Sequence, residues 1–276
     1  MFSTIVIGYD GSAQSDDALA LALALADPAT ALVAVFVHPR LPGAARGEPA
    51  WPAALTERDG ARTVARPATS AAAGLAAVVD ETGADLVVVG SSRRGPVGRV
   101  LPGTTGAQVL HATAAAVAVA PAGLRERAPV ALREIGVGFD GGAESTRALA
   151  AAVRLAAEHG AKLRAIAVIE PVGETFGWAG AWMYPEYRDD AVAGAREALA
   201  AAVRDAEAEA LGVTVAEEVV DGLPAEELAR ASERLDLLVL GSRGYGPLGR
   251  LLLGSVATRV ANAAACPLLV WPRAAG

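Results

Sequence analysis

The sequence predicts an α/β protein made of two tandem, doubly wound, parallel five-stranded sheets. The first observation is a repeat, because IVIGYDGS at 5–12 returns as IGVGFDGG at 135–142. The second is the block ADLVVVGSSRRGPVGRVLPGT at 84–104, which aligns without a gap with LDLLVLGSRGYGPLGRLLLGS at 235–255. The third is the alternation of short apolar runs with helical stretches, which is typical of parallel strands covered by helices.

The repeat also sets the domain organisation. VAVAP at 117–121 matches LLVWP at 268–272, so the matched blocks keep their order in both halves. We expect domains at 1–122 and 131–276, joined through Ala122–Arg133, a charged segment without apolar periodicity. The two apolar final strands are expected to pair edge to edge as an intrachain pseudo-dimer. A homodimer of the whole chain stays open.

The first half reads as strands separated by helices, with Gly83 stopping the middle helix. Expected strands are Ile5–Tyr9, Leu32–Val37, Thr63–Ala65, Leu86–Val89 and Ala116–Ala120, and expected helices are Ser12–Ala26, Thr69–Glu81 and Gly103–Ala112.

In the second half, we expect Ser145 to cap a helix that ends at Gly160. A strand is expected at Val213–Val220, and Pro224 begins a helix over Ala225–Arg234. This half is longer mainly through Glu170–Asp190, which gathers two tryptophans and two tyrosines. They are Trp178, Trp182, Tyr184 and Tyr187. Such a segment is interpreted as a lid or interaction surface, or as a loop packed on its own domain.

Composition argues against several classes of protein and of binding site. A net charge of -7 over 276 residues disfavours a nucleic-acid surface. Cys266 is the only cysteine, so it is expected in the core, without a disulfide or a cysteine metal site. Lys162 is the only lysine, so no GxxxxGK[ST] loop exists. The apolar stretch from Ala18 stops at Asp27, and the start lacks a basic region, so we expect a cytoplasmic protein.

Ligands of doubly wound sheets bind beyond the carboxyl ends of the strands, where the winding reverses. In the second half, the loop there runs Gly241-x2-Gly244-x9-Gly254-Ser255, and Ser255 opens the next helix. Glycine lets the backbone approach a phosphate closely, and a helix start offers free N–H groups to an anion. Arg243 in this loop, like Arg250, supplies local positive charge.

These blocks resemble the universal stress protein family in its tandem form. ATP-binding members carry G-x2-G-x9-G-[S/T] after the fourth strand, and the second half fits it fully at Gly241, Gly244, Gly254 and Ser255. The resemblance implies an adenine nucleotide α hydrolase-like, Rossmann-like fold that binds ATP in a regulatory, stress-response role. It places ribose and phosphates on the motif. The implied adenosine contacts are Asp10-Gly11 and Asp140-Gly141 after the first strands, with the backbone near Val37 and Val168 at the adenine ring.

The first half departs from the pattern. Gly90, Gly103 and Thr104 fit, but Arg93 replaces the second glycine. Its side chain either blocks the approach of the phosphates or binds one of them. The sequence therefore predicts that the second half holds ATP more tightly.

The sequence leaves alternatives to ATP binding in a regulatory role. Asp10 and Asp140 could help to hold Mg²⁺, and slow hydrolysis stays open, but no catalytic constellation is present. Residues 139–145 resemble the SGGxDS loop of PP-loop ATP pyrophosphatases, although Asp140 and Glu144 stand in place of its serine and aspartate. A third alternative is an interaction module that binds no nucleotide.

Overall fold

The computed structural model describes residues 1–39, 47–92, 98–100, 104–127, 129–170, 177–209, 211–242 and 254–272. Within these residues ten strands form a single sheet, in the order β3-β2-β1-β4-β5-β10-β9-β6-β7-β8. The strands are β1 (Thr4–Gly8), β2 (Ala31–Pro39), β3 (Ala61–Ala68), β4 (Leu86–Gly90), β5 (Ala116–Ala120), β6 (Glu134–Phe139), β7 (Lys162–Ile169), β8 (Val215–Asp221), β9 (Leu237–Gly241) and β10 (Leu268–Trp271).

Each half of the sheet is doubly wound. All strand pairs inside a half are parallel, with β1 between β2 and β4, and β6 between β7 and β9. The halves meet where β10 pairs antiparallel with β5, with Leu269 opposite Ala118. The two five-stranded sheets expected from the sequence are therefore halves of one continuous sheet, and the expected edge-to-edge pairing of the apolar final strands is confirmed.

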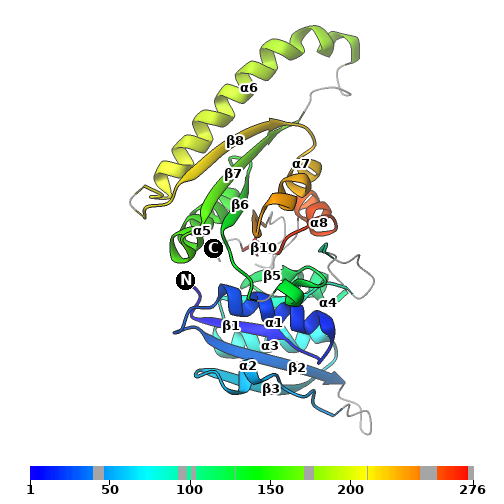
Figure 1. Ribbon diagram of the computed structural model, residues 1–276. Coiled ribbons are helices and arrows are strands. Elements are labelled where there is room, and N and C mark those ends of the chain that lie inside the picture. Colours follow the sequence, from blue (N-terminus) through cyan, green and yellow to red (C-terminus); the bar gives the residue numbers. More distant parts are fainter. Residues whose placement is uncertain are drawn as a thin grey trace.

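Helices cover both faces of the sheet (Figure 1). One buried cluster lies under α1, α2, α5 and α6, and the other lies under α3, α4, α7 and α8. Both clusters contain residues from both halves, so the halves share their cores. The helices are α1 (Ala13–Leu25), α2 (Ala53–Thr56), α3 (Ala71–Thr82), α4 (Thr104–Ala112), α5 (Ala143–His159), α6 (Gly177–Asp205), α7 (Pro224–Ala231) and α8 (Ser255–Ala261).

Several local predictions need correction. β3 extends over Ala61–Ala68 instead of Thr63–Ala65, because it pairs with β2 along its whole length. β8 is Val215–Asp221, and α7 stops at Ala231 before a 3₁₀ turn at Ser232–Arg234. Gly142, not Ser145, caps α5, because the Ser145 hydroxyl lies inside the first turn and donates to the Gly142 carbonyl. The predicted end of α5 is confirmed, since Gly160 has a φ of 60°.

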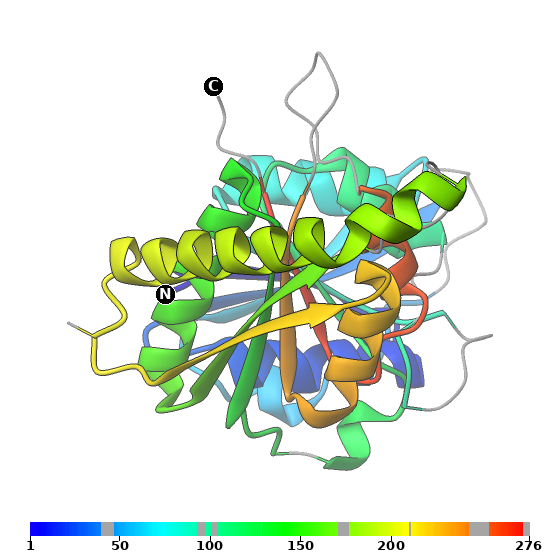
Figure 2. The same ribbon diagram turned by 90° about the horizontal axis from the view of Figure 1, so that it is seen from above.

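The described part of the aromatic segment is helical, so the alternative of a loop packed on its own domain needs correction. Residues 171–176 lie outside the described part, and 177–190 form the first turns of the 29-residue helix α6. Figures 1 and 2 show α6 running along the edge strand β8. Arg188 donates to Asp221 at the end of β8 from Nε (3.1 Å) and Nη2 (2.5 Å), which fixes the helix there. The segment is therefore an extension of a regular helix.

Candidate functional site

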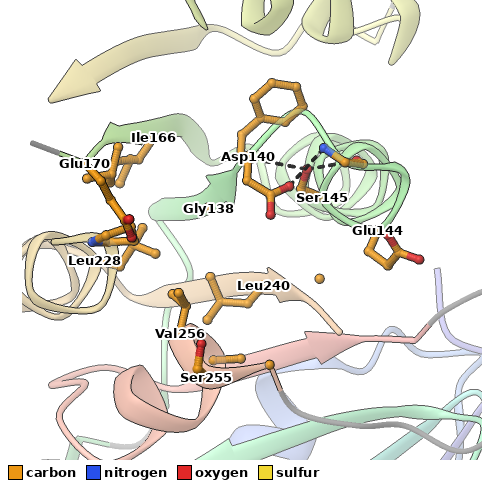
Figure 3. Close-up of a pocket in the computed structure, with 17 residues that line it drawn as sticks. Gly138, Asp140, Glu144, Ser145, Ile166, Glu170, Leu228, Leu240, Ser255 and Val256 are labelled. Atoms are coloured by element: carbon orange, nitrogen blue, oxygen red, sulfur yellow. Dashed lines mark hydrogen bonds between the residues drawn. The ribbon is translucent and has the colours of Figure 1, made fainter. Parts of the chain in front are cut away.

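A cavity of about 860 Å³ opens in the second half, at the carboxyl ends of β6, β7 and β9 (Figure 3). β6 and β9 are neighbours, while the chain continues from β6 to β7 on one side and from β8 to β9 on the other. The cavity thus lies at the reversal of winding where such sheets bind ligands. Its described lining is Gly138, Phe139, Asp140, Gly142, Glu144, Ser145, Ile166, Val168, Glu170, Pro224, Leu228, Leu240, Gly241, Gly254, Ser255, Val256 and Ala257.

A tight turn after β6 positions Asp140 at the cavity. Gly141 has a φ of 78°, a left-handed conformation that favours glycine. The Gly142 N–H donates to Asp140 Oδ1 (2.9 Å), and the Asp140 N–H donates to Ser145 Oγ (3.3 Å). The turn is therefore fixed by its own hydrogen bonds, and Figure 3 shows them beside the cavity.

The first half repeats this turn after β1. Gly11 has a φ of 75°, and the Ser12 N–H donates to Asp10 Oδ1 (3.0 Å). Val37 occupies on β2 the place of Val168 on β7, as the paired registers of Ile5 with Leu32 and Ile135 with Leu163 show. The predicted adenosine residues thus have equivalent backbone positions in both halves.

Gly241 and Gly90, the first glycines of the two loops, have a packing role. A Cβ on Gly241 would lie 2.7 Å from the carbonyl of Glu144, in the first turn of α5. A Cβ on Gly90 would lie 2.6 Å from the carbonyl carbon of Gln14, in the first turn of α1. Both positions require glycine because a helix start crosses the strand end there.

The opposite side of the cavity is the start of α8. Gly254 caps this helix and Ser255 is its first residue, as predicted, and both line the cavity. Arg243 and Gly244 lie outside the described residues, as do Arg93 and Gly103 in the first half. Thr104 begins α4, and its side chain also lies outside the description.

The wall between these loops was missed from the sequence. It is apolar and comes from three elements: Ile166 on β7, Leu228 on α7, and Leu240 on β9. Leu228 is 4% exposed and belongs to the core, so no local signal separates it from the other buried leucines. Its place one turn after Pro224, in the helix that follows a predicted strand, was the one available indication in the sequence.

The described lining is acidic. Asp140, Glu144 and Glu170 contribute carboxylates, and no arginine or lysine is among the described lining residues. The described residues also contain no group of three or more His, Cys, Asp or Glu side chains arranged to hold a metal. An anionic ligand would therefore need compensating positive charge from elsewhere.

Fold and site together define a class: tandem α/β proteins with two adenine nucleotide α hydrolase-like halves. The model of the universal stress protein family matches residues 1–121 and 131–272. The chain belongs to the universal stress protein family. In the part of the chain that is described, no helix is both long and apolar enough to cross a membrane.

Known proteins agree with this assignment. A universal stress protein of Mycobacterium tuberculosis is 31% identical over 214 residues, which cover 74% of this chain and 69% of that protein. The match to one of Mycolicibacterium smegmatis, 36% identical over 137 residues, spans 49% of this chain and 46% of that protein. The crystal structure of a universal stress protein from Archaeoglobus fulgidus superposes with a TM-score of 0.62 at 18% identity, covering 98% of this chain and 96% of its own. The last comparison supports the tandem fold alone.

Proposed function

We propose that this protein is an ATP-binding regulatory protein and that its second-half cavity holds the nucleotide. One observation carries the proposal. Five residues assigned to ATP from the sequence pattern, drawn from four separate segments, all line one cavity at the reversal of winding. They are Asp140, Val168, Gly241, Gly254 and Ser255.

The size and chemistry of the cavity suit a nucleotide. A volume of about 860 Å³ lies within the ~300–1,000 Å³ common for small-molecule sites. The apolar side chains of Ile166, Val168 and Leu228 suit the face of a base, and the Asp140 carboxylate suits ribose hydroxyls. At the other side, the first N–H groups of α8 suit phosphate oxygens.

Compensating charge has two sources in this proposal. The first is Arg243 and Arg250, which follow Gly241 in the sequence and carry positive charge that an arginine can offer to phosphate groups. A Mg²⁺ ion brought with the nucleotide would supply the rest, because carboxylate oxygens such as those of Asp140 and Glu144 are ligands that it accepts. Both sources make binding dependent on the charge balance of the cavity.

The role proposed is binding without efficient catalysis. The described lining contains no histidine, and the Ser145 hydroxyl is used by the backbone of its own turn. In the described lining no histidine is therefore available to activate a serine as a nucleophile. Occupancy of the cavity by ATP is the regulatory signal in this proposal.

Two substitutions on one helix test it. Ser255→Asp adds a carboxylate at the cavity, where a helix start tolerates it, and should weaken binding of Mg²⁺-ATP at least about ten-fold through repulsion of the phosphates. Thr258→Asp adds the same charge one turn later at an exposed position that is not in the described lining, so binding should stay near wild type. Titration calorimetry measures both, and native mass spectrometry of gently purified protein reports co-purified ATP. Equal affinities of the two variants, or wild-type protein that never takes up ATP, would contradict the proposal.

A further inference from the structure

Two residues of the first half, Arg99 and Val100, form hydrogen bonds to the second half. Gly98–Val100 lie between β4 and α4, in the stretch that matches the glycine pattern. The Val100 N–H donates to the Ala264 carbonyl (2.7 Å), and Arg99 Nη1 donates to the Ala263 carbonyl (2.7 Å). Arg99 also pairs with Glu233 Oε1 at 3.4 Å. Both acceptor carbonyls and Glu233 belong to the second half.

Burial strengthens this attachment. Val100 is 0% exposed and belongs to the same buried cluster as Val260 and Ala264. On its other side the stretch is joined to its own half, because the Gly98 N–H donates to the Ala122 carbonyl (2.8 Å). Val100 is therefore a buried apolar residue at the boundary between the halves. Backbone hydrogen bonds from Gly98 and Val100 join this stretch to the first and the second half, respectively.

The acceptors on the second half are continuous with α8. The N–H groups of Ala263 and Ala264 both donate to the Val260 carbonyl, at 2.9 and 2.8 Å, in the last turn of α8. The other end of the same helix lines the second-half cavity with Ser255, Val256 and Ala257. One short helix thus contacts the cavity at its start and is bonded to Val100 just after its end.

We propose that Arg99 and Val100 are positioning residues that attach Gly98–Val100 of the first half to α8 of the second half. Through them, a displacement of α8 at the second-half cavity is transmitted to Gly98–Val100. The physical basis is the hydrogen bonds to the carbonyls of Ala263 and Ala264 and the burial of Val100 in the cluster that contains Val260. The transmission, but not the attachment, rests on the proposed binding of ATP.

Hydrogen exchange of the ligand-free full chain tests the attachment. Val100→Ala should speed exchange of the Gly98 and Val100 amides about ten-fold or more, because the local opening is no longer opposed by a buried contact. Arg99→Ala changes a half-exposed side chain and leaves the core intact, so it serves if Val100→Ala fails to fold, with about three-fold faster exchange expected. Arg62→Ala on the edge strand β3, also exposed, is the matched control and should leave these amides unchanged. Wild-type rates at Gly98 and Val100 in the folded variants would overturn the attachment.

The transmission is tested by repeating the hydrogen-exchange measurement with saturating Mg²⁺-ATP. In wild type, exchange should slow in α8, in Gly98–Val100 and in α4, while in the Arg99→Ala, Val100→Ala double variant it should slow only in α8. Slowing confined to α8 in wild type would overturn the transmission. If ATP alters exchange nowhere, the proposed nucleotide function and the transmission both fail, and the ligand-free comparison still decides the attachment.

Discussion

The Asp17 carboxylate, fully buried on α1, accepts hydrogen bonds from the backbone N–H of Arg125 (2.9 Å) and from Arg125 Nη1 (3.3 Å). It also accepts from the Gly123 N–H (2.9 Å). Through these bonds, the segment expected to be a plain linker folds back on the first half as a 3₁₀ turn at Leu124–Arg127. The 3% exposure of Leu124 shows that this turn is part of the core.

Asp17→Ala should therefore destabilise the protein by about 3 kcal/mol, because two backbone N–H groups lose their buried acceptor. Glu126→Ala is the matched control. Its carboxylate pairs with Arg125 at the surface, at 66% exposure, so the change should stay within about 0.5 kcal/mol. Urea unfolding followed by circular dichroism measures both. A loss for Asp17→Ala no larger than that of the control would show that the turn is held by Leu124 alone.

Gly90→Ala should destabilise by about 2–3 kcal/mol or prevent folding, because its Cβ would overlap the Gln14 carbonyl. Gly194→Ala is the matched control on α6. A Cβ there meets nothing within 4 Å, so helix propensity should stabilise the chain by about 0.5–1 kcal/mol. Thermal unfolding of the two variants should shift in opposite directions, and a shift in the same direction would contradict the packing role of Gly90.

Burial, together with the nearby charge of Asp236, raises the pKa of the Cys266 thiol from 9.0 to about 12. The native state thus keeps the proton while the unfolded chain loses it above pH 9. Stability should fall by roughly 1.4 kcal/mol per pH unit as the pH rises from 9 toward 12, and this contribution should be unchanged below pH 9. Urea unfolding of wild type and Cys266→Ala between pH 8 and 10.5 isolates it. Parallel pH profiles for the two proteins would contradict the raised pKa of the Cys266 thiol.

The two halves are predicted to bind ATP unequally. Gly244→Arg should weaken binding at the second half at least about ten-fold, because a Cβ and a long side chain obstruct the phosphates. Arg93→Gly should strengthen the first site if the arginine is an obstruction, and weaken it if its guanidinium binds phosphate. Calorimetry of wild type and both variants separates these outcomes. Wild-type affinity in Gly244→Arg, with loss of binding in Arg93→Ala, would mean that the sites are assigned in reverse.

Chymotrypsin tests the anchoring of α6. Arg188→Ala removes the paired hydrogen bonds to Asp221, so cleavage after the aromatic residues at 178–187 should accelerate about two- to five-fold, in keeping with a partly exposed ion pair. Arg196→Ala, an exposed arginine on the same helix, should not change the rate. Equal rates in the two variants would show that Arg188 does not hold the helix.

Much of this fold could be predicted from sequence because the same pattern of strands, helices and glycines occurs in both halves. β5 was predicted to the residue, since its apolar run is short and its match with LLVWP at 268–272 fixed its position. The buried Cys266 was likewise expected from its apolar surroundings and is 2% exposed. Local sequence was sufficient for these features because burial on both faces of a parallel strand leaves an unbroken apolar run.

Other features depend on tertiary contacts that have no local pattern. β3 carries polar residues along an edge strand, so its length is set by pairing with β2 and not by hydropathy. The cavity wall at Leu228 arises because α7 follows β8 across the sheet to meet β7. Gly241 was expected in a ligand-binding loop, but its contact with the start of α5 was not expected. The spacing of residues in the sequence does not show where a helix crosses the end of a strand.

The antiparallel pairing of β5 with β10 has a further consequence. In an assembly of identical chains, every residue near a two-fold axis would occur twice, and each substitution would have to suit both copies. Here covalent fusion holds the halves at a high effective concentration, so their association does not depend on dilution. The two sides of the boundary are free to differ: Asp17 holds the turn after β5, whereas the equivalent position on α5 is Arg147, which pairs with Glu144 at the cavity. A tandem chain can therefore have two different sites on the two similar halves of one continuous sheet.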